Sequence, residues 1–421
     1  MVMATQQNKS ATYCVSHRPK QKVFFNSKSA LMRKICMVAY AYYSQDARIP
    51  KEAEALAQQG MKVDCFCLRE RGHVGWEVVN DVNVYHLPLS KYRGTSTFRY
   101  ILSYILFFML SFFVITKFYF KQRYNVIQFH TLPDFIIFAG VIPKLCGAKL
   151  LLDMHEIMPE FYMSKFNVGM SHPLIKLLKL LEKISVRFAD AVIVINEPIK
   201  RLLLQRCKFK SVPTVIMNCA DDRLFNANYL PSSSNSDDFN LMYHGTLTKI
   251  YGLEVAIQAV AKLKNQVPNL KFYIFGNEEE ADNLKKLVNQ LGVCKNVIFV
   301  GRVSREEIPQ YINRADIGIL PTIRDVFIDY SFSNKLAEYV CMKTPVVSTR
   351  LKSTLEYFSE DTISYFESQN VDDLASKIYE LYTNPQKRLL QAEKAFQYYQ
   401  KIRWAIMRER YIELIYSLMN Q

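Results

Sequence analysis

The stretch DYSFSNKLAEYVCMKTPVVST covers residues 329–349 and contains a helical pattern followed by a short apolar strand. Ser333 and Asn334 are good N-cap residues, and they predict a helix that runs to about Met342. The apolar segment DIGILP (316–321) stands before this unit. A strand, a helix and a second strand in this order predict two parallel strands joined by a crossover helix.

The same alternation extends outward through most of the 421 residues. Further segments that we expect to be strands lie at 34–40, 61–68, 82–88, 125–130, 148–153 and 190–195, and then at 239–245, 270–276, 296–301 and 362–366. Helical patterns lie between most of them, and Ser304 with Glu307 forms a capping box for a helix over 304–315. The sequence therefore predicts an α/β protein with parallel sheets.

A stretch rich in Asn, Asp, Ser and Pro at 218–238 divides this alternation into two parts, as a linker would. We therefore expect a first domain at 32–217, a second domain at 239–397 and an amphipathic C-terminal helix at 398–421. Residues 1–31 carry five basic side chains, no acidic ones and no signal-peptide apolar core. This segment is expected to be a disordered basic tail.

The net charge of +15 is concentrated in the first half of the chain. Residues 32–215 hold 25 Lys and Arg against 14 Asp and Glu, whereas residues 216–421 hold 24 against 25. An anionic partner, either lipid headgroups or a phosphate-bearing acceptor, would suit this half, and a merely basic surface is the alternative. Nucleic acid is disfavoured because no recognition motif accompanies the charge. The nine cysteines include no Cys-x-x-Cys pair, which indicates reduced thiols in an intracellular protein.

One segment, FRYILSYILFFMLSFFVITKFYF (98–120), has seventeen uncharged residues between Arg99 and Lys117. Three interpretations are open: a helix buried against the sheet, a helix partly sunk into a membrane interface, and a spanning helix. The flanking basic residues favour the interface. Spanning takes about 20 apolar residues, and a spanning helix would interrupt the first α/β domain.

Two loops of the second domain have residues suited to a diphosphate. The loop in YHGTLTKIYG (243–252) follows the first strand of that domain, and its small residues let backbone N–H groups approach a phosphate. It lacks Gly-x-Gly-x-x-Gly, which disfavours an NAD enzyme. Lys249 either contacts a phosphate or is an ordinary exposed lysine.

The second of these loops opens the helix that begins at Ser333. Free N–H groups, a positive dipole end and Lys335 meet there. Glu338 lies one turn inside the helix, where its carboxylate could accept two hydrogen bonds from ribose hydroxyls. The alternative is an ordinary surface acid paired with Lys335.

These segments together resemble the family 4 glycosyltransferases, in particular a subgroup with S-N-K-L-x-E-Y before a Pro-Val-Val strand. The resemblance runs from about Met32 to the C-terminus, and it includes Asp46-Ala-Arg48, DMHE (153–156), FYIFG (272–276) and the last helix with Trp404. It implies the GT-B fold, in which two Rossmann-like α/β domains face each other across a cleft. It also implies that the last helix crosses back to the first domain.

The resemblance also assigns site residues by position. The diphosphate would lie on Ser333, Asn334, Lys335 and Leu336, the ribose on Glu338, and Gly245 and Thr246 would line the phosphate pocket. Lys249 and Gly276 are further donor-binding candidates. His155 matches the family histidine near the transferred sugar and is the catalytic candidate, with a structural histidine as the alternative. Asp329 and Tyr330 are possible sugar contacts, because many relatives carry a Glu at the position of Tyr330. Relatives also often have a basic residue where this chain has Tyr251.

The function that the resemblance implies is retaining transfer of a sugar from a UDP- or GDP-sugar to a lipid-linked or cell-envelope glycan. No cofactor and no metal are expected, since the chain has no Asp-x-Asp. The protein would lie at the cytoplasmic face of an anionic membrane. The alternatives are a catalytically silent GT-B scaffold, which Tyr330 favours, and a nucleotide-sugar epimerase, against which the basic first half and residues 98–120 speak.

Overall fold

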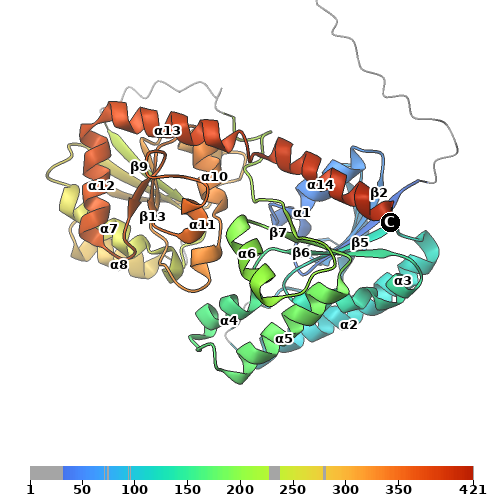
Figure 1. Cartoon of the computed structure of the whole chain (residues 1–421). Coiled ribbons are helices and arrows are strands. Elements are labelled where there is room, and N and C mark those ends of the chain that lie inside the picture. The colour runs from blue at the N-terminus through green and yellow to red at the C-terminus, as the bar shows by residue number, and fades with distance from the viewer. Residues whose placement is uncertain are drawn as a thin grey trace, which may run out of the picture. The chain divides into compact units, whose positions relative to one another are not determined.

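Two β-sheets organise the chain, and helices cover both (Figure 1). The computed structural model describes residues 32–420, except residues 71, 74, 93, 95, 227–237 and 278–280. The expected tail at 1–31 and most of the expected linker therefore lie outside the described residues. One strand pair is antiparallel and the others are parallel, which confirms the predicted α/β architecture with parallel sheets.

The first sheet has eight strands in the order β3-β4-β2-β1-β5-β6-β7-β8. Their bounds are β1 Lys34–Ala39, β2 Lys62–Leu68, β3 Trp76–Val79, β4 Val82–Leu87, β5 Val126–His130, β6 Lys149–Met154, β7 Ala191–Val194 and β8 Thr214–Val215. The sequence analysis missed β3, which pairs antiparallel with β4. No apolar run marks this strand because its residues are all exposed or half-buried.

Helices of this first unit cover its sheet on both faces. They are η1 Tyr43–Gln45, α1 Ile49–Ala57, α2 Thr97–Gln122, η2 Asp134–Gly140, α3 Val141–Leu145, α4 Met158–Phe166, α5 Pro173–Phe188 and α6 Glu197–Arg206. Helix α1 packs on β2 and α2 packs on η2. Short segments after β1 and β6 bring polar side chains to the carboxyl edge of this sheet.

The second sheet is wholly parallel, in the order β11-β10-β9-β12-β13-β14. Its strands are β9 Phe239–His244, β10 Leu270–Phe275, β11 Val297–Gly301, β12 Ile317–Leu320, β13 Val346–Thr349 and β14 Ser364–Phe366. Its helices are η3 Lys249–Tyr251, α7 Leu253–Leu263, α8 Asp282–Gln290, α9 Ile308–Ile312, η5 Ile328–Tyr330, α10 Asn334–Cys341, α11 Lys352–Leu355, α12 Val371–Thr383 and α13 Pro385–Tyr399.

Strand order reverses between β1 and β5 at the centre of the first sheet and between β9 and β12 in the second. Open α/β sheets bind ligands beyond the carboxyl ends of their strands, at the point where the order reverses. The fold therefore predicts that functional side chains lie on the loops after these strands.

Helix α2 has one packed face and one exposed apolar face. Tyr104, Phe107 and Ile115 are buried on the inner face. The outer face exposes the large apolar side chains of Phe98, Leu102, Ile105, Leu106, Met109 and Phe113. Only 22% of the most apolar window is buried, so a fully buried helix is the wrong interpretation. By length and composition this helix could cross a membrane. A single helix of this kind is only weak evidence for a membrane span.

The helix predicted over 304–315 is shorter in the structure, where α9 covers Ile308–Ile312. Glu307 accepts hydrogen bonds from the backbone and hydroxyl of Ser304 at 2.9 and 2.7 Å. The hydroxyl of Ser304 therefore donates to Glu307 instead of capping the helix. Pro309 lies in the first turn of α9, where its missing N–H costs least.

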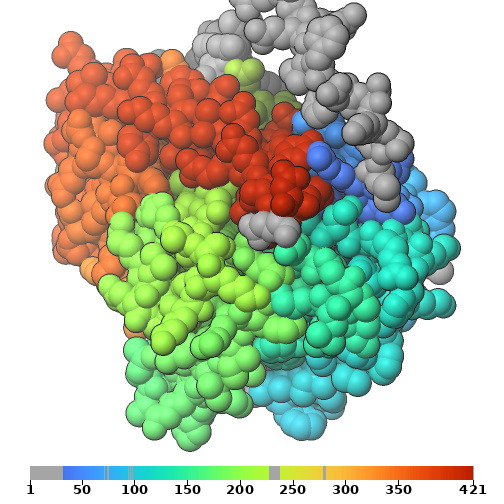
Figure 2. Space-filling view, turned by 45° about the vertical axis from the view of Figure 1, so that its right-hand side comes forward, coloured from blue at the N-terminus to red at the C-terminus, as the bar shows by residue number. Residues whose placement is uncertain are grey.

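The C-terminal run predicted at 398–418 is divided by a bend. Helix α13 ends at Tyr399 and α14 begins at Trp404, continuing to Met419. Helix α14 packs on α1 and β5 of the first sheet. Figure 2 shows this segment in red, passing from the orange second unit onto the green and blue residues of the first.

Candidate active site

A cleft of about 1220 Å³ is lined by residues of both sheets. On the second sheet they come from the ends of β9, β10 and β11, and on the first from α1 and the segments around β3 and β4. Of the predicted site residues, Gly245, Thr246, Gly276 and Glu338 line this cleft. The two α/β units thus face each other across a cleft, as predicted.

Glycines let the strand ends pack backbone against backbone at the cleft wall. A Cβ on Gly276 would lie 2.4 Å from the carbonyl oxygen of Gly245. Gly245 itself has φ +124°, a conformation that L side chains rarely adopt. A side chain at either position would disturb this edge, and the exposed backbone remains accessible to a phosphate.

Lys335 extends from α10 across Gly245. A Cβ on Gly245 would lie 2.3 Å from Cε of Lys335, and the Lys335 ammonium lies 4.2 Å from the ring centre of Tyr251. Burial lowers the pKa of Lys335 to about 8, although the charge of Glu338 acts in the opposite direction. Relatives often have a basic residue at the position of Tyr251. Here the aromatic ring of Tyr251 instead stabilises the positive charge of Lys335.

Glu338 is almost buried on the same helix as Lys335. Burial raises its pKa to about 7, while Arg305, Lys335 and Lys51 act in the opposite direction. Its Oε2 lies 3.5 Å from Nε2 of His244. Burial lowers the pKa of His244 to about 3, so this histidine is neutral and the contact is not an ion pair. Nε2 of His244 has no hydrogen-bond partner among the described residues.

The other predicted donor residues lie at the start of α10 or on η3. Ser333 occupies the N-cap position, but its side chain accepts no hydrogen bond from the helix. Asn334 is exposed and Leu336 is buried. Lys249 is exposed on η3, and neither Lys249 nor Lys335 is among the residues that line the cleft. Lys335, however, lies directly beside Gly245 at the glycine edge.

Asp329 and Tyr330, the predicted sugar contacts, do not line the cleft. The carboxylate of Asp329 accepts hydrogen bonds from Arg324 at 3.0 and 3.1 Å and pairs with Lys352 at 3.3 Å. The carbonyl of Tyr330 accepts a hydrogen bond from Asn196 at 2.7 Å. In this geometry both residues hold η5 in place, and the geometry does not support direct contact with a sugar.

Basic residues that the sequence analysis did not select also line the cleft. Arg302 and Arg305 follow β11, and Lys51 lies on α1. The ammonium of Lys51 donates to the carbonyl of Cys219 at 2.6 Å. The position of the two arginines directly after a strand was the signal that could have identified them.

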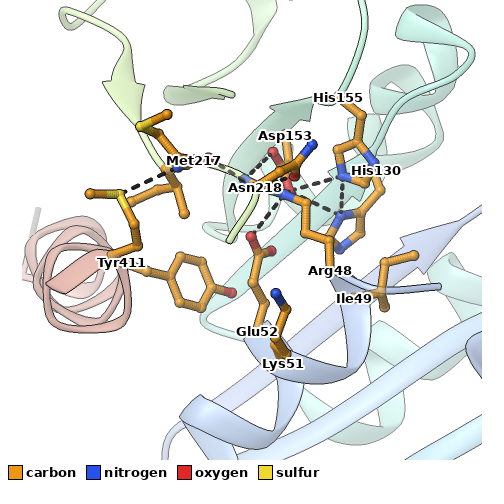
Figure 3. A network of polar contacts seen from close by, with 12 residues as sticks. Arg48, Ile49, Lys51, Glu52, His130, Asp153, His155, Met217, Asn218 and Tyr411 are labelled. Atoms are coloured by element: carbon orange, nitrogen blue, oxygen red, sulfur yellow. Dashed lines mark hydrogen bonds and ion pairs between the residues drawn. The ribbon is translucent and has the colours of Figure 1, made fainter. Parts of the chain in front are cut away.

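A buried network lies behind the carboxyl edge of the first sheet (Figure 3). Arg48 donates two hydrogen bonds to Asp153, both 2.9 Å long, and a third to the carbonyl of Ile216 at 2.8 Å. Gln128 donates to Glu52 at 2.7 Å and to Asp153 at 3.4 Å. Arg48 therefore neutralises Asp153 inside the domain and ties it to the chain that leads into the second unit.

Glu52 lies within 3.0 Å of Nε of Arg48, but that N–H is directed at Asp153. Its Oε1 has no hydrogen-bond partner among the described residues. Burial raises the pKa of Glu52 to about 8, although Arg48 acts in the opposite direction. Glu52 is therefore protonated near neutral pH, and Arg48 and Asp153 form the charged pair.

His155, the catalytic candidate, follows β6 and belongs to the same network. Its Nε2 lies 3.1 Å from Oδ2 of Asp153 and 3.1 Å from Nδ1 of His130. Burial alone would lower the pKa of His155, but the charge and hydrogen bond of Asp153 outweigh burial and raise it. Burial lowers the pKa of His130. Of the two imidazoles, that of His155 therefore holds a proton more readily than that of His130.

These three side chains also have the atom types of a metal site, since Nδ1 of His130, Oδ2 of Asp153 and Nε2 of His155 lie close together. Arg48, however, binds both carboxylate oxygens of Asp153. A guanidinium at this distance already supplies the positive charge and would repel a divalent cation. This triangle of His130, Asp153 and His155 is therefore better suited to hold a hydrogen-bonded proton than a metal ion.

His155 opens into a pocket of about 230 Å³ at the point where the order of the first sheet reverses. Aromatic and charged side chains dominate its wall, among them Tyr40, Asp46, Lys91, Tyr100, Tyr104, His130, Glu156 and Phe161. Tyr100 and Tyr104 come from the inner face of α2. Asp46 lines both this pocket and the large cleft, so the two spaces meet there.

The C-terminal helix reaches the network from the other side. Tyr411 of α14 is fully buried, and its hydroxyl donates to Oε1 of Gln128 at 2.6 Å. Because that oxygen is occupied, the amide N–H₂ of Gln128 is directed at Glu52 and Asp153. Tyr411 thus fixes the orientation of Gln128. Gln128 in turn contacts Asp153, the hydrogen-bond partner of His155.

Comparison with known proteins identifies the architecture. Residues 46–219 match the glycosyl transferase 4-like domain, and residues 230–398 match the family of glycosyl transferases group 1. A chitobiosyldiphosphodolichol β-mannosyltransferase of Debaryomyces hansenii is 20% identical over 361 residues, which are 79% of this chain and 75% of that protein.

Solved structures agree over nearly the whole chain. Sucrose-phosphate synthase from Thermosynechococcus elongatus superposes with a TM-score of 0.74 at 17% identity, covering 92% of this chain and 99% of the other. HepE of Anabaena, solved with UDP-glucose, gives a TM-score of 0.68 at 15% identity, with 91% and 99% covered. The family matches, which together span most of the chain, and these structures lead to one conclusion: the chain belongs to the glycosyl transferases group 1 and is a glycosyltransferase of GT-B fold.

Proposed function

We propose that this glycosyltransferase moves a sugar from a UDP- or GDP-sugar to a lipid-linked or cell-envelope glycan, with retention of configuration and without a metal ion. The observation that carries the proposal is the junction at Asp46 between the basic, glycine-edged cleft and the His155 pocket. A sugar at this junction would lie between a donor held by the second domain and an acceptor held by the first.

Two similar proteins support the substrate classes. HepE was solved in complex with UDP-glucose, and the Debaryomyces relative acts, by its name, on chitobiosyldiphosphodolichol. For the present chain we infer a nucleotide-sugar donor and an acceptor that carries a lipid diphosphate.

In the donor half, positive groups would stabilise the departing nucleotide diphosphate. Lys335 and the N-terminus of α10 lie beside Gly245, and Arg302 and Arg305 line the same cleft. Preorganised charges of this kind act where negative charge develops in the transition state. The proposal needs no metal because these groups supply the positive charge.

The bond between the anomeric carbon and the diphosphate oxygen would break as the bond to the acceptor oxygen forms on the same face. The hydroxyl proton of the acceptor would pass to the departing phosphate, which balances the charges. His155, whose pKa Asp153 raises, would donate a hydrogen bond to the transferred sugar. Closure of the two domains would exclude water and limit hydrolysis.

The acceptor half is suited to a sugar attached to a lipid. Sugar rings pack on aromatic side chains, and Tyr100 and Tyr104 supply these from the inner face of α2. Lys91 adds a positive charge at the pocket. The outer face of the same helix exposes apolar side chains, so a lipid in a membrane could present its sugar directly to His155.

The apolar face that would touch the membrane is formed by Leu102, Ile105, Leu106, Met109 and Phe113 of α2 with Leu177, Leu180 and Ile184 of α5. Both helices pack on η2 and run side by side in Figure 1. Exposed basic residues border them, namely Arg99, Lys117, Lys121, Arg123, Lys176, Lys183 and Arg187. Apolar rows bordered by basic residues are typical of helices that lie in an anionic interface. We therefore place the protein at the cytoplasmic face of a membrane.

The direct test is transfer from labelled UDP- and GDP-sugars to lipid extracts, with the product anomer assigned by NMR. We expect one nucleotide class to serve, activity to survive EDTA, and the anomeric configuration to be retained. An inverted product would contradict retention, and loss of activity in EDTA would contradict metal independence. A nucleotide at a hundredfold its Kd should also stabilise the protein by about 2.7 kcal/mol, and no stabilisation by any nucleotide would contradict the donor cleft.

Replacing Phe113 with glutamate is expected to weaken binding to anionic vesicles by about tenfold or more, because burying a Phe side chain contributes about 1.5–3 kcal/mol. Vesicle co-sedimentation measures the effect. Leu389→Glu is the matched control, since Leu389 is 67% exposed on α13. Equal binding by both variants would show that the apolar face does not contact lipid.

Donor binding is expected to release protons near neutral pH, because ribose hydroxyls that donate to Glu338 favour its carboxylate form. The free protein holds this proton below about pH 7, where burial has raised the pKa of Glu338. Donor affinity should therefore fall as the pH is lowered through 7. Calorimetry in two buffers of different ionisation enthalpy counts the protons, and Glu338→Gln should abolish their release. Unchanged release in that variant would assign it to another group.

A further inference from the structure

A second cluster of ligand-type side chains lies on the first-domain wall of the cleft, away from His155. Nδ1 of His73 lies 3.0 Å from Oε1 of Glu77, and Nε2 of His86 lies 2.8 Å from the same oxygen. All three residues line the cleft. The potential ligand atoms lie within 4.8 Å of one another.

The β3–β4 hairpin explains this convergence. Glu77 pairs with Val84 in the antiparallel ladder, and the N–H of His86 donates to the carbonyl of Gly75. Glu77 and His86 therefore project from the same face of the hairpin as diagonal neighbours, a separation that long side chains bridge. His73 reaches the same carboxylate from the segment that leads into β3. Two of the three side chains, those of Glu77 and His86, are thus placed by backbone pairing within the hairpin.

The charge of the cluster favours a cation. A second carboxylate, that of Glu70, lines the same cleft as these three residues. Within the described part of the chain, the ion-pair partners of Glu77 are His73 and His86. This distinguishes the cluster from the His155 triangle, where Arg48 already neutralises the carboxylate.

We propose that His73, Glu77 and His86 form a binding site for one divalent transition-metal cation of the zinc type. Two imidazoles and one carboxylate are a common ligand set for zinc with an open fourth position. Ligands about 2.0–2.2 Å from a tetrahedral ion lie about 3.3–3.6 Å apart, so the two contacts to Glu77, at 3.0 and 2.8 Å, need to open only slightly. A cation here would replace the protons that the histidines now direct at Glu77.

The open position of this ion would face the cleft. The side chain of His86 is 5% exposed, whereas those of His73 and Glu77 are 41% and 39% exposed. One ligand is therefore anchored in the wall, and two lie at the surface, where the ion enters. A phosphate or carboxylate oxygen of a molecule in the cleft could complete the coordination. The site lies apart from the groups proposed to stabilise the leaving diphosphate, and it does not depend on them.

Titration of tag-free, metal-stripped protein with Zn²⁺ against a chromophoric chelator tests the proposal. We expect one tightly bound Zn²⁺ per chain. His73→Ala and Glu77→Gln should each lower the affinity at least about tenfold, as loss of a ligand costs no less than loss of an outer-shell partner. Both residues are partly exposed, so the variants should remain folded, and thermal unfolding verifies this. His172→Ala, which removes an exposed histidine at the start of α5, should bind Zn²⁺ as tightly as the unaltered protein.

Co²⁺ provides an independent measurement, because the exposed thiols of Cys146 and Cys294 are rival ligands. Coordination by the cluster predicts visible d–d absorption without a thiolate-to-cobalt charge-transfer band. A charge-transfer band, or equal Zn²⁺ affinity in the unaltered protein and in His73→Ala and Glu77→Gln, would overturn the proposal. Loss of binding in His172→Ala would do the same.

Discussion

Replacing Arg48 with alanine is expected to lower the free energy of unfolding by about 3–5 kcal/mol, because it leaves a buried carboxylate without its cation. Asp153 is fully buried, and Arg48 donates to both of its oxygens at 2.9 Å. The substitution also removes the hydrogen bond to the carbonyl of Ile216. Denaturant unfolding of the purified variant measures the loss.

Arg201→Ala is the matched control for this substitution. Arg201 binds Glu356 with two hydrogen bonds of 2.8 and 2.6 Å, but its side chain is 55% exposed. Exposed pairs contribute about 0–1 kcal/mol. A similar small loss in Arg48→Ala would show that Asp153 is protonated or hydrated once the cation is gone.

The loss in Arg48→Ala should depend on pH. In the unaltered protein Arg48 and His155 hold the pKa of Asp153 well below its usual range against the effect of burial. That carboxylate contributes stability above its unfolded pKa of about 3.9, and the contribution is lost in acid. In the variant burial dominates and raises the pKa, so the charged form destabilises. The difference between the two proteins should therefore grow from acid to neutral pH.

Replacing Lys335 with alanine is expected to reduce kcat/KM by about 10²–10³-fold, the size of effect seen when one preorganised group is removed from a developing negative charge. The ammonium lies over Tyr251 and beside the Gly245 backbone, where the proposed diphosphate departs. The fold should tolerate the change, because burial lowers the pKa of Lys335 and its charge therefore costs stability. Initial rates over a range of donor concentrations measure the effect.

Lys249→Ala is the control for Lys335→Ala, since the sequence offers both lysines as phosphate contacts, but Lys335 lies beside Gly245 whereas Lys249 is exposed on η3. We expect it to stay within about twofold of the unaltered enzyme, as for surface positions in general. The kcat/KM of the unaltered enzyme should also fall above about pH 8, because the free enzyme loses the Lys335 proton there. Equal losses of kcat/KM in Lys335→Ala and Lys249→Ala would show that the phosphate does not bind next to Lys335.

Much of the fold could be predicted because buried parallel strands appear in the sequence as apolar runs. The runs at 34–40 and 239–245 became β1 and β9, the first strands of the two sheets. Strand β3 could not be found in this way, because its side chains are exposed or half-buried. The exposed face of α2 was equally hidden, since a helix that is apolar on all sides does not indicate which side packs. The bend between α13 and α14 is fixed by contacts such as that of Tyr399 with Ala220, which are remote in sequence.

The candidate site was predictable where it depends on local order along the chain. Lys335 and Glu338 share one helix, so their proximity followed from spacing. Arg48 and Asp153 are separated by 105 positions, and no local pattern indicates that they meet. The Arg324 and Lys352 contacts that bind Asp329 are likewise products of folding. A family resemblance indicates which positions belong to the site. It does not indicate which hydrogen-bond or ion-pair partners each side chain has in the folded protein.

The hydrogen bond between Tyr411 and Gln128 joins positions 283 residues apart, and this separation has a consequence for biosynthesis. Translation proceeds from the N-terminus, so every strand of the first sheet has left the ribosome before Tyr411 is made. Until then Oε1 of Gln128 lacks the tyrosine hydroxyl, and the surface that α14 will cover remains open to solvent and to other nascent chains. The last step in folding the first domain thus waits until α14 has been translated. A premature stop codon before Trp404 should therefore lower the yield of soluble protein, although every strand of both sheets has already been translated.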